Sequence, residues 1–275
     1  MSETTFVKKL ASNERPVRES AIEALKQYLS RDKKLSLLKY QKLWKGLYYS
    51  MWFSDRPRPQ QRLAMVLGKL FSETIPLNSF TVFVEAFWSL IIREWPQIDR
   101  HRIDKFYLLL RRVIGCCFER LKKEDWDVEL VNSYVETLQK NVLSGQVKIP
   151  LSLTFHIIDV YIDELEKVMF EDINDEELAN EDLDEEEKEK LMKEINEQKK
   201  EILEEVPLDE LFKVFGKLKQ STGIKVLKAK IDEDLIADER IQEWKIKVED
   251  DSDNEEEEDD EEGEEDEESD EEYFQ

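Results

Sequence analysis

The 275-residue chain contains little of what sheets, active sites and membrane anchors are made from. Only seven Gly and seven Pro occur, so a sheet protein with many tight turns is disfavoured. There are two His and two Cys, with no Gly-rich phosphate loop, no nucleophile motif and no paired ligands at metal-binding spacing. No apolar run approaches the roughly 20 residues of a membrane span, and the first residues do not resemble a signal peptide. We therefore expect a soluble intracellular protein with no catalytic residues, metal site, cofactor, small-molecule substrate or membrane segment.

The few residues that could imitate a reactive site have simpler interpretations. Cys116 and Cys117 are adjacent, and neighbours on a helix point about 100° apart, so the pair is poorly placed to form a disulfide or to bind a metal together. We expect two buried reduced thiols. Asp99 and Asp104 flank His101, but carboxylates at the start of a helix suit its dipole, and we interpret them as helix-capping residues.

Charge is distributed very unevenly along the chain. The formal net charge is −25, yet residues 1–170 contain 27 Lys and Arg against 21 Asp and Glu, a net charge of +6. Residues 171–248 have a net charge of −11, and residues 249–272 contain 20 acids and no base. The sequence thus predicts a basic body followed by an acidic tail at 249–275, which we expect to be disordered.

Apolar residues in the basic body recur at helical spacing, which predicts an all-α fold. The expected helices form pairs, namely 6–11 with 17–29, 40–53 with 60–71, 80–95 with 102–121, and 126–143 with 151–169. Equivalent residues of the second helices recur at an interval of 42 residues, as in Leu25, Leu67 and Leu109. An interval of about 40 to 47 residues per helical pair is typical of HEAT and armadillo repeats. A HEAT/armadillo-like helical-repeat array is therefore expected, with an irregular helical bundle as the alternative.

The chain changes character after residue 170. We expect a helical-repeat domain at 1–170, an acidic linker and charged helix at 171–206, and a partly helical extension at 207–248. The extension has no clear period in its second half, and we interpret it as a segment ordered by a partner. Its candidate partner-binding apolar residues are Phe212, Phe215 and Trp244.

Basic residues gather at the turns between paired helices and on the second helices. Stacked repeats would align them, and guanidinium groups offer planar forks of donors that suit phosphate oxygens. The candidate RNA or partner contacts are Arg56, Arg58, Arg62, Arg100, Arg102, Lys105, Arg111 and Arg112. The alternative is that some of them form structural ion pairs with Asp55, Asp99 and Asp104 inside the turns.

A dense aromatic run precedes the first arginine turn. Trp44, Tyr48 and their neighbours at helical spacing are expected in the core, whereas Trp52 and Phe53, at the rim, are candidate partner contacts. In the acidic tail, Ser252 and Ser269 are each followed three residues later by an acid, which is the pattern of an acid-directed serine kinase. Both are candidate phosphorylation sites.

Two segments carry a resemblance to a known family. These are KLWKGLYYSMWFSDRPRPQQRLA at 42–64 and QIDRHRIDKFYLLLRRV at 97–113. The chain resembles the nucleolar ribosomal RNA-processing protein 1 family over about 60 % of its length, from residue 6 to about residue 168. The resemblance implies a HEAT-like, non-catalytic factor of the nucleus and nucleolus. Such a factor joins large-subunit precursor (pre-60S) particles, supports processing of the rRNA precursor, and contacts pre-rRNA and other assembly factors, including Brix-domain and WD-propeller proteins.

Two mechanisms are compatible with this family. Either the arginine turns bind pre-rRNA directly, or the array is chiefly a protein adaptor. A net charge of +6 is modest for a dedicated RNA-binding protein, so we expect the adaptor role to be the larger. Outside the family, an acid-tailed chaperone or transport adaptor for basic nuclear proteins is the alternative, and that function would depend on the tail.

Overall fold

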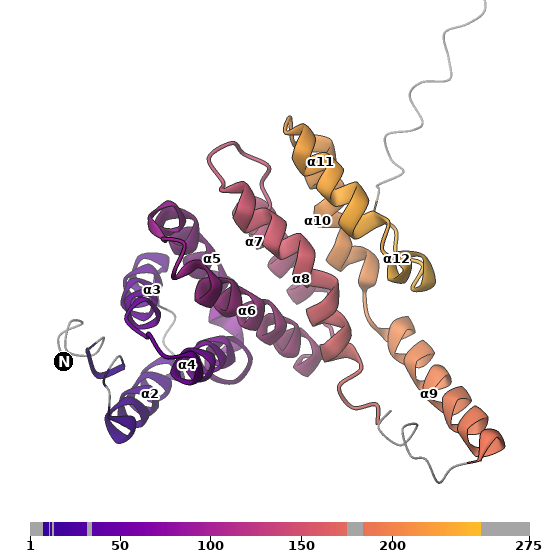
Figure 1. The fold of residues 1–275 in the computed structure, drawn as a ribbon, viewed down its shortest axis with the longest axis horizontal. Helices are drawn as coiled ribbons and strands as arrows, with labels where there is room; N and C mark the ends of the chain where they lie inside the picture. The colour runs from indigo at the N-terminus through magenta and orange to yellow at the C-terminus, as the bar shows by residue number, and fades with distance from the viewer. Residues whose placement is uncertain (1–7, 11, 13, 32–34, 175–183, 249–275) are drawn as a thin grey trace, which may run out of the picture.

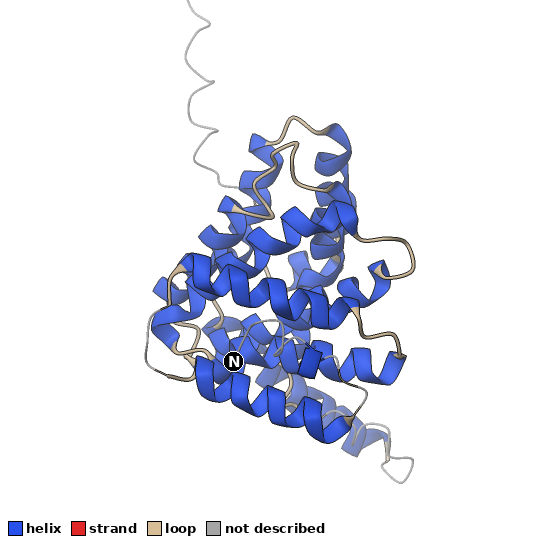
Figure 2. Ribbon diagram, turned by 90° about the vertical axis from the view of Figure 1, so that its left-hand side faces the viewer, coloured by secondary structure: helices blue, strands red, loops and turns tan. Residues whose placement is uncertain are grey.

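The computed structural model describes residues 8–10, 12, 14–31, 35–174 and 184–248. Within these ranges the chain consists of helices and connecting loops, without a strand (Figure 2). The helices lie side by side in chain order, from the indigo N-terminal pairs at the left of Figure 1 to the orange C-terminal helices at the right. The prediction of an all-α helical-repeat fold is confirmed.

The helices follow one another closely along the chain. After a short turn of helix at 8–10, they are α2 (Arg15–Leu29), α3 (Leu37–Trp52), α4 (Pro57–Lys69), the π-helical segment η1 (Leu70–Thr74), α5 (Leu77–Glu94) and the 3₁₀ turn η2 (Trp95–Gln97). They continue with α6 (Ile103–Lys123), α7 (Val128–Lys140), α8 (Leu151–Met169) and α9 (Glu185–Glu205). The last are α10 (Leu208–Ser221), α11 (Lys225–Ile231), the π-helical segment η4 (Asp232–Ile236) and α12 (Glu239–Glu243).

These helices form two layers. The first layer contains α3, α5, α7 and α10, each packed against the next, and the second contains α4, α6, α8 and then α11 with η4. Neighbours within a layer are parallel. Between α3 and α5, for example, Tyr40 contacts Phe83 near the start of both helices, and Lys45 pairs with Glu94 further along both. Parallel stacking of helical pairs in two layers is the arrangement of HEAT and armadillo arrays.

The aromatic run of α3 lies in the core, as the sequence predicts. Trp44 is 1 % exposed and is surrounded by rings from both layers. Its ring lies 5.5 Å from Phe71, 5.1 Å from Phe83 and 4.8 Å from Phe87. Such close ring pairs contribute about 0.5 to 1.5 kcal/mol each beyond the burial of their area. The first two complete repeats are therefore joined by an aromatic cluster.

Two glycines allow the second-layer helices to approach closely. A Cβ atom at Gly68 on α4 would lie 2.9 Å from the backbone oxygen of Arg112 on α6. A Cβ atom at Gly115 on α6 would lie 2.8 Å from a carboxylate oxygen of Glu164 on α8. Backbone atoms cannot move away cheaply, so the contact between α4 and α6 requires glycine at residue 68.

The segment after residue 207 is part of the stack, and its expected role is wrong. Phe212 and Phe215 are 0 % exposed, and their rings lie 5.5 and 4.9 Å from Tyr161 on α8. Trp244 is 9 % exposed and lies edge-on to Phe170 at 6.0 Å. These three side chains cannot bind another protein in this fold, because they cover α7 and α8 of the same chain. The π-helical segment η4 interrupts the 3.6-residue period, which is why this part of the sequence shows no clear pattern.

The charged helix α9 differs from the others. It begins with a capping box. The backbone N–H of Glu187 donates to the Asp184 carboxylate, and the backbone N–H of Asp184 donates to the Glu187 carboxylate. Ile195 is its only buried residue, and α9 extends to the lower right of the stack in Figure 1. No helix in the described parts of the chain is long and apolar enough to cross a membrane.

Candidate functional site

The turns that lead from the first layer to the second lie together at one edge of the stack. We call this surface the turn edge and define it as residues 53–58, 95–105, 141–150 and 222–225. Polar contacts between neighbouring turns include Lys105 Nζ to Ser54 O (2.9 Å) and Thr222 Oγ1 to Gly145 O (3.4 Å), and Trp95 Nε1 donates to Ser152 Oγ (3.0 Å) just beyond the third turn. The turn edge is therefore a continuous surface across four repeats.

The turn edge and the opposite edge carry opposite charge. The turn edge contains seven Lys or Arg and three Asp or Glu. The turns that lead back, at 70–77, 121–129, 169–174 and 205–210, contain two Lys and ten Asp or Glu. A polyanion is thus attracted to the turn edge and repelled by the opposite one.

Four of the predicted arginines are available to a ligand. Arg56, Arg58, Arg62 and Arg100 are exposed, and none forms an ion pair within the part of the chain that the structure describes. Among the described residues, the polar contact of Arg100 is with the ring of His101, with Nε and Nε2 3.4 Å apart. Free guanidinium groups at neighbouring turns can donate to phosphate or carboxylate oxygens.

Lys105 is structural, so the expectation that it contacts RNA or a partner is wrong, whereas Arg102 forms an ion pair but keeps a partly exposed side chain. Lys105 is 6 % exposed, and its Nζ donates to Trp52 O at 2.6 Å and Ser54 O at 2.9 Å, which caps the C-terminal end of α3. Burial lowers the pKa of Lys105. Arg102 pairs with Asp99, and its guanidinium lies 4.6 Å from the ring centre of Trp52. The alternative of ion pairs within the turns holds for Arg102.

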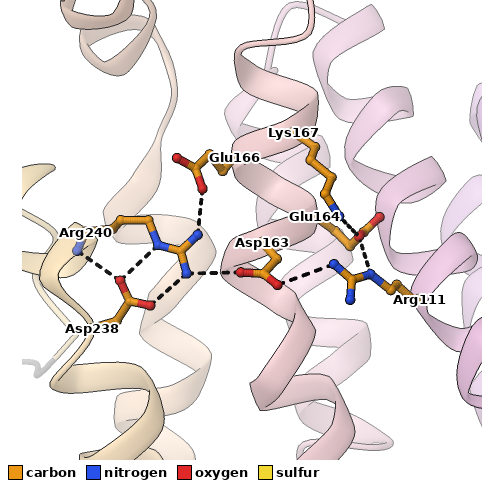
Figure 3. Close-up of polar contacts among 7 residues, drawn as sticks. All are labelled: Arg111, Asp163, Glu164, Glu166, Lys167, Asp238 and Arg240. Carbon is orange, nitrogen blue, oxygen red and sulfur yellow. Dashed lines mark hydrogen bonds and ion pairs between the residues drawn. The ribbon is translucent and has the colours of Figure 1, made fainter.

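Arg111 also forms ion pairs within the protein, and its side chain is partly exposed. Its Nε lies 2.5 Å from Glu164 Oε1, and its Nη2 lies 3.3 Å from Asp163 Oδ2 (Figure 3). From the other side, Arg240 donates to Asp163 at 3.1 Å and to Glu166 at 2.6 Å. The acidic residues of α8 thus join α6 to the C-terminal helices. Arg112 is half-buried on α6 and has no ion pair among the described residues.

The two aromatic residues at the rim differ from each other. Trp52 is half-buried, packs against Phe106 at 6.4 Å and is covered by Arg102. Phe53 is 59 % exposed and stacks on Tyr49 at 6.1 Å with an angle of 21° between the rings. Only Phe53 of this pair presents a largely open ring to a partner.

Two further cations belong to the turn edge but were not predicted from the sequence. Lys148 and Lys225 are exposed and precede or begin the second helices of the last two pairs, just as Arg56 and Arg100 precede α4 and α6. A basic residue at the start of each second helix is a signal that could have identified them.

The remaining candidate residues give no site in the structure. Within the described ranges, no group of three or more His, Cys, Asp and Glu side chains is placed to hold a metal ion. Cys116 and Cys117 are buried free thiols, as expected, and burial raises the pKa of Cys116 to about 12. The phosphorylation candidates Ser252 and Ser269 lie outside the described residues.

Comparison with known proteins identifies the family. The family model described as "Nucleolar protein, Nop52" matches residues 1–274. The human ribosomal RNA processing protein 1 homolog B is 37 % identical over 172 residues, which are 61 % of this chain and 23 % of that protein. The Caenorhabditis elegans ribosomal RNA processing protein 1 homolog is 31 % identical over 167 residues, which are 60 % of this chain and 42 % of that protein.

The chain spans less than half the length of these relatives, and the matched segments agree in extent with the resemblance noted from the sequence. The family description also agrees with the expected nucleolar location. On the match over nearly its whole length, the chain belongs to the Nop52 family of nucleolar proteins.

Proposed function

We propose that this chain is a non-catalytic scaffold of large-subunit ribosome assembly, required for processing of the rRNA precursor. It binds pre-rRNA along the turn edge and other assembly factors, among them Brix-domain and WD-propeller proteins, along its helical faces. The relatives are named ribosomal RNA processing proteins, which supports a role in rRNA processing. The observation that carries the mechanism is the opposite charge of the two edges of the stack.

The turn edge suits the backbone of RNA rather than its bases. Its free cations are spaced over successive repeats, so each can meet a different phosphate, and a row of such contacts binds without strong sequence preference. The excess is only four positive charges, from seven Lys or Arg and three Asp or Glu. RNA affinity from this edge is modest, and protein contacts in the particle supply the remaining binding energy.

The experiment is a salt titration of RNA binding. The full chain and the variant Arg58→Gln/Arg100→Gln/Lys148→Gln bind a labelled single-stranded pre-rRNA fragment over a range of salt concentrations. Each lost phosphate contact lowers the slope of log K against log salt by about 0.7, so the variant should lose about 2 units of slope.

A matched control has the same change in charge elsewhere. Lys190→Gln/Lys193→Gln/Lys200→Gln alters three side chains of α9, away from the turn edge, and should leave the slope unchanged. Equal slopes for all three proteins would show that the turn edge does not bind RNA.

A second function is favoured by the acidic surfaces. The opposite edge and the 20 acids after residue 248 could hold basic nuclear proteins, as a chaperone or transport adaptor would. That function requires the tail. Cells in which residues 249–275 are deleted should process rRNA normally if the scaffold role is correct, and should lose the main interaction of the protein if the chaperone role is correct.

A further inference from the structure

A cleft lies between α2 and α4, at the N-terminal end of the second layer. The helices α4, α6 and α8 pack against one another, but α2 makes its main helix contact with η1, which follows the C-terminal end of α4. Toward the turn edge α2 and α4 therefore enclose a cleft of about 610 Å³, a size typical of ligand sites. No described segment fills it.

The walls of the cleft combine aliphatic with polar side chains, and the charged side chains among them are net basic. The apolar lining includes Leu10, Ile22, Leu63 and Val66, which come from α2, α4 and the turn before α2. The exposed ring of Phe53 also lines the cleft. The charged residues of the lining are Arg15, Arg18, Arg56 and Arg62 together with Glu19 and Asp55.

Two of these arginines are open to a ligand. Arg15 Nε lies 2.6 Å from Glu19 Oε1, so these two charges largely compensate each other. Arg18 donates to Ser12 O at 2.7 Å. Arg56 and Arg62 are exposed and have no ion pair within the described ranges. Within the described ranges, the cleft thus presents guanidinium groups without an ion pair beside the aliphatic part of its lining.

The aliphatic part of the lining, from Leu10, Ile22, Leu63 and Val66, favours protein over nucleic acid as the occupant. A nucleotide base has polar edges, and against the aliphatic part of the lining those groups would lack hydrogen bonds, at a cost of about 1 to 3 kcal/mol for each. An aliphatic or aromatic side chain loses nothing there and gains from burial. Carboxylates on either side of such a side chain would meet Arg56 and Arg62.

We propose that the cleft between α2 and α4 binds a segment of another protein, in which an apolar side chain enters the cleft and flanking Asp or Glu residues pair with Arg56 and Arg62. The inference deepens the proposed scaffold role and rests on it for the identity of the partner. Arg56 belongs to both the turn edge and the cleft, but the RNA-binding test changes only Arg58, Arg100 and Lys148, none of which lines the cleft, so the two ideas can fail separately.

The experiment places a photocrosslinking residue in the cleft of the full chain. Phe53 is replaced by p-benzoylphenylalanine in cells, native particles are irradiated, and the crosslinked peptide is sequenced. We expect a peptide of another protein with an apolar residue flanked by Asp or Glu. The same photocrosslinker at Leu77, which is 46 % exposed at the start of α5, is the control and should not capture this peptide.

The crosslinked peptide is then synthesised and its binding to the purified chain is measured. Arg56→Glu/Arg62→Glu should weaken binding about tenfold or more, because both charge pairs become repulsive. Arg58→Glu/Arg100→Glu has the same charge change outside the cleft and should have a much smaller effect.

Several results would overturn the proposal. They are a crosslink to RNA, a crosslink to residues 249–275 of the same chain, a peptide without acidic residues, no crosslink at all, or equal affinities for the two charge variants. If the peptide binds as expected but the salt titration shows no effect of the turn edge, the cleft inference stands and the proposed RNA contact fails. If the salt titration shows RNA binding at the turn edge but the peptide does not bind as expected, only the cleft inference fails.

Discussion

Replacing Phe212 by Ala tests whether the C-terminal helices belong to the fold or wait for a partner. The side chain is 0 % exposed and its ring meets Tyr161 edge-on at 5.5 Å. Truncation of a fully buried Phe removes its transfer energy and leaves a cavity, which together cost about 3 to 5 kcal/mol. With a urea m-value of about 3 kcal/mol/M for a protein of this size, the unfolding midpoint should fall by about 1 to 1.7 M.

The assay is urea unfolding followed by circular dichroism. Val226→Ala, on the neighbouring helix α11, is the matched control, because Val226 is 60 % exposed and its truncation should change stability by less than about 0.5 kcal/mol. If Phe212→Ala instead kept the midpoint and only lost co-purified proteins, Phe212 would be a partner contact and the packing described here would be wrong.

Three further predictions concern buried polar groups and thiols. Lys105→Met removes the side-chain donor to Trp52 O, whereas Ser54 O still accepts from Gln60, and should lower the free energy of unfolding by about 1 to 3 kcal/mol; wild-type stability in urea would contradict the capping role. Burial opposes ionisation of Glu94, but hydrogen bonds from basic side chains including Lys45 outweigh it and hold its pKa below 4.5. Because the folded pKa is depressed, the stabilisation by Glu94 is present above about pH 4.5 and is lost as pH falls through the folded value. Glu94→Gln should therefore destabilise the protein by about 1 to 3 kcal/mol at pH 7 and become equivalent to wild type in acid, and a pH-independent difference in denaturation experiments would refute this. Cys116 and Cys117 should resist iodoacetamide at pH 8 in the native protein and react after unfolding, as intact mass would show, and rapid native alkylation would mean that this core opens readily.

The parts of the fold that sequence could predict are those with regular, local signals. The 42-residue register correctly relates α4 to α6, because equivalent apolar residues such as Leu67 and Leu109 both face the core. The start of α8 was also predicted correctly at residue 151, directly after Pro150, whereas α4 begins at Pro57, three residues before the predicted start. Periodicity fails at η4, since a π-helical segment shifts the residues that follow it out of phase. The helices on either side of η4 were thus missed.

The candidate site was harder to predict, because the role of a charge depends on residues far away in the chain. Arg111 and Arg112 are adjacent and equally basic, yet only Arg111 reaches Glu164, which lies 53 residues later. Lys105 is buried because the end of α3 and the turn after it, about 50 residues earlier in the chain, pack against its side chain. The sequence pattern predicts only that these arginines lie at the turns. Tertiary packing decides which of them form ion pairs, and Arg56, Arg58, Arg62 and Arg100 form none with the residues that the structure describes.

The most direct test of the scaffold account is ultraviolet crosslinking of RNA to the full chain in native nuclear particles. Wild type is compared with Arg58→Glu/Arg100→Glu/Lys148→Glu, and both RNA crosslinks and co-purified proteins are recorded. The account predicts that wild type crosslinks to large-subunit rRNA precursor at the turn edge and that the variant loses these crosslinks while it keeps its protein partners. Wild-type particles without crosslinks at the turn edge, together with a variant that loses protein partners instead, would contradict direct RNA binding and assign this edge to a protein interface.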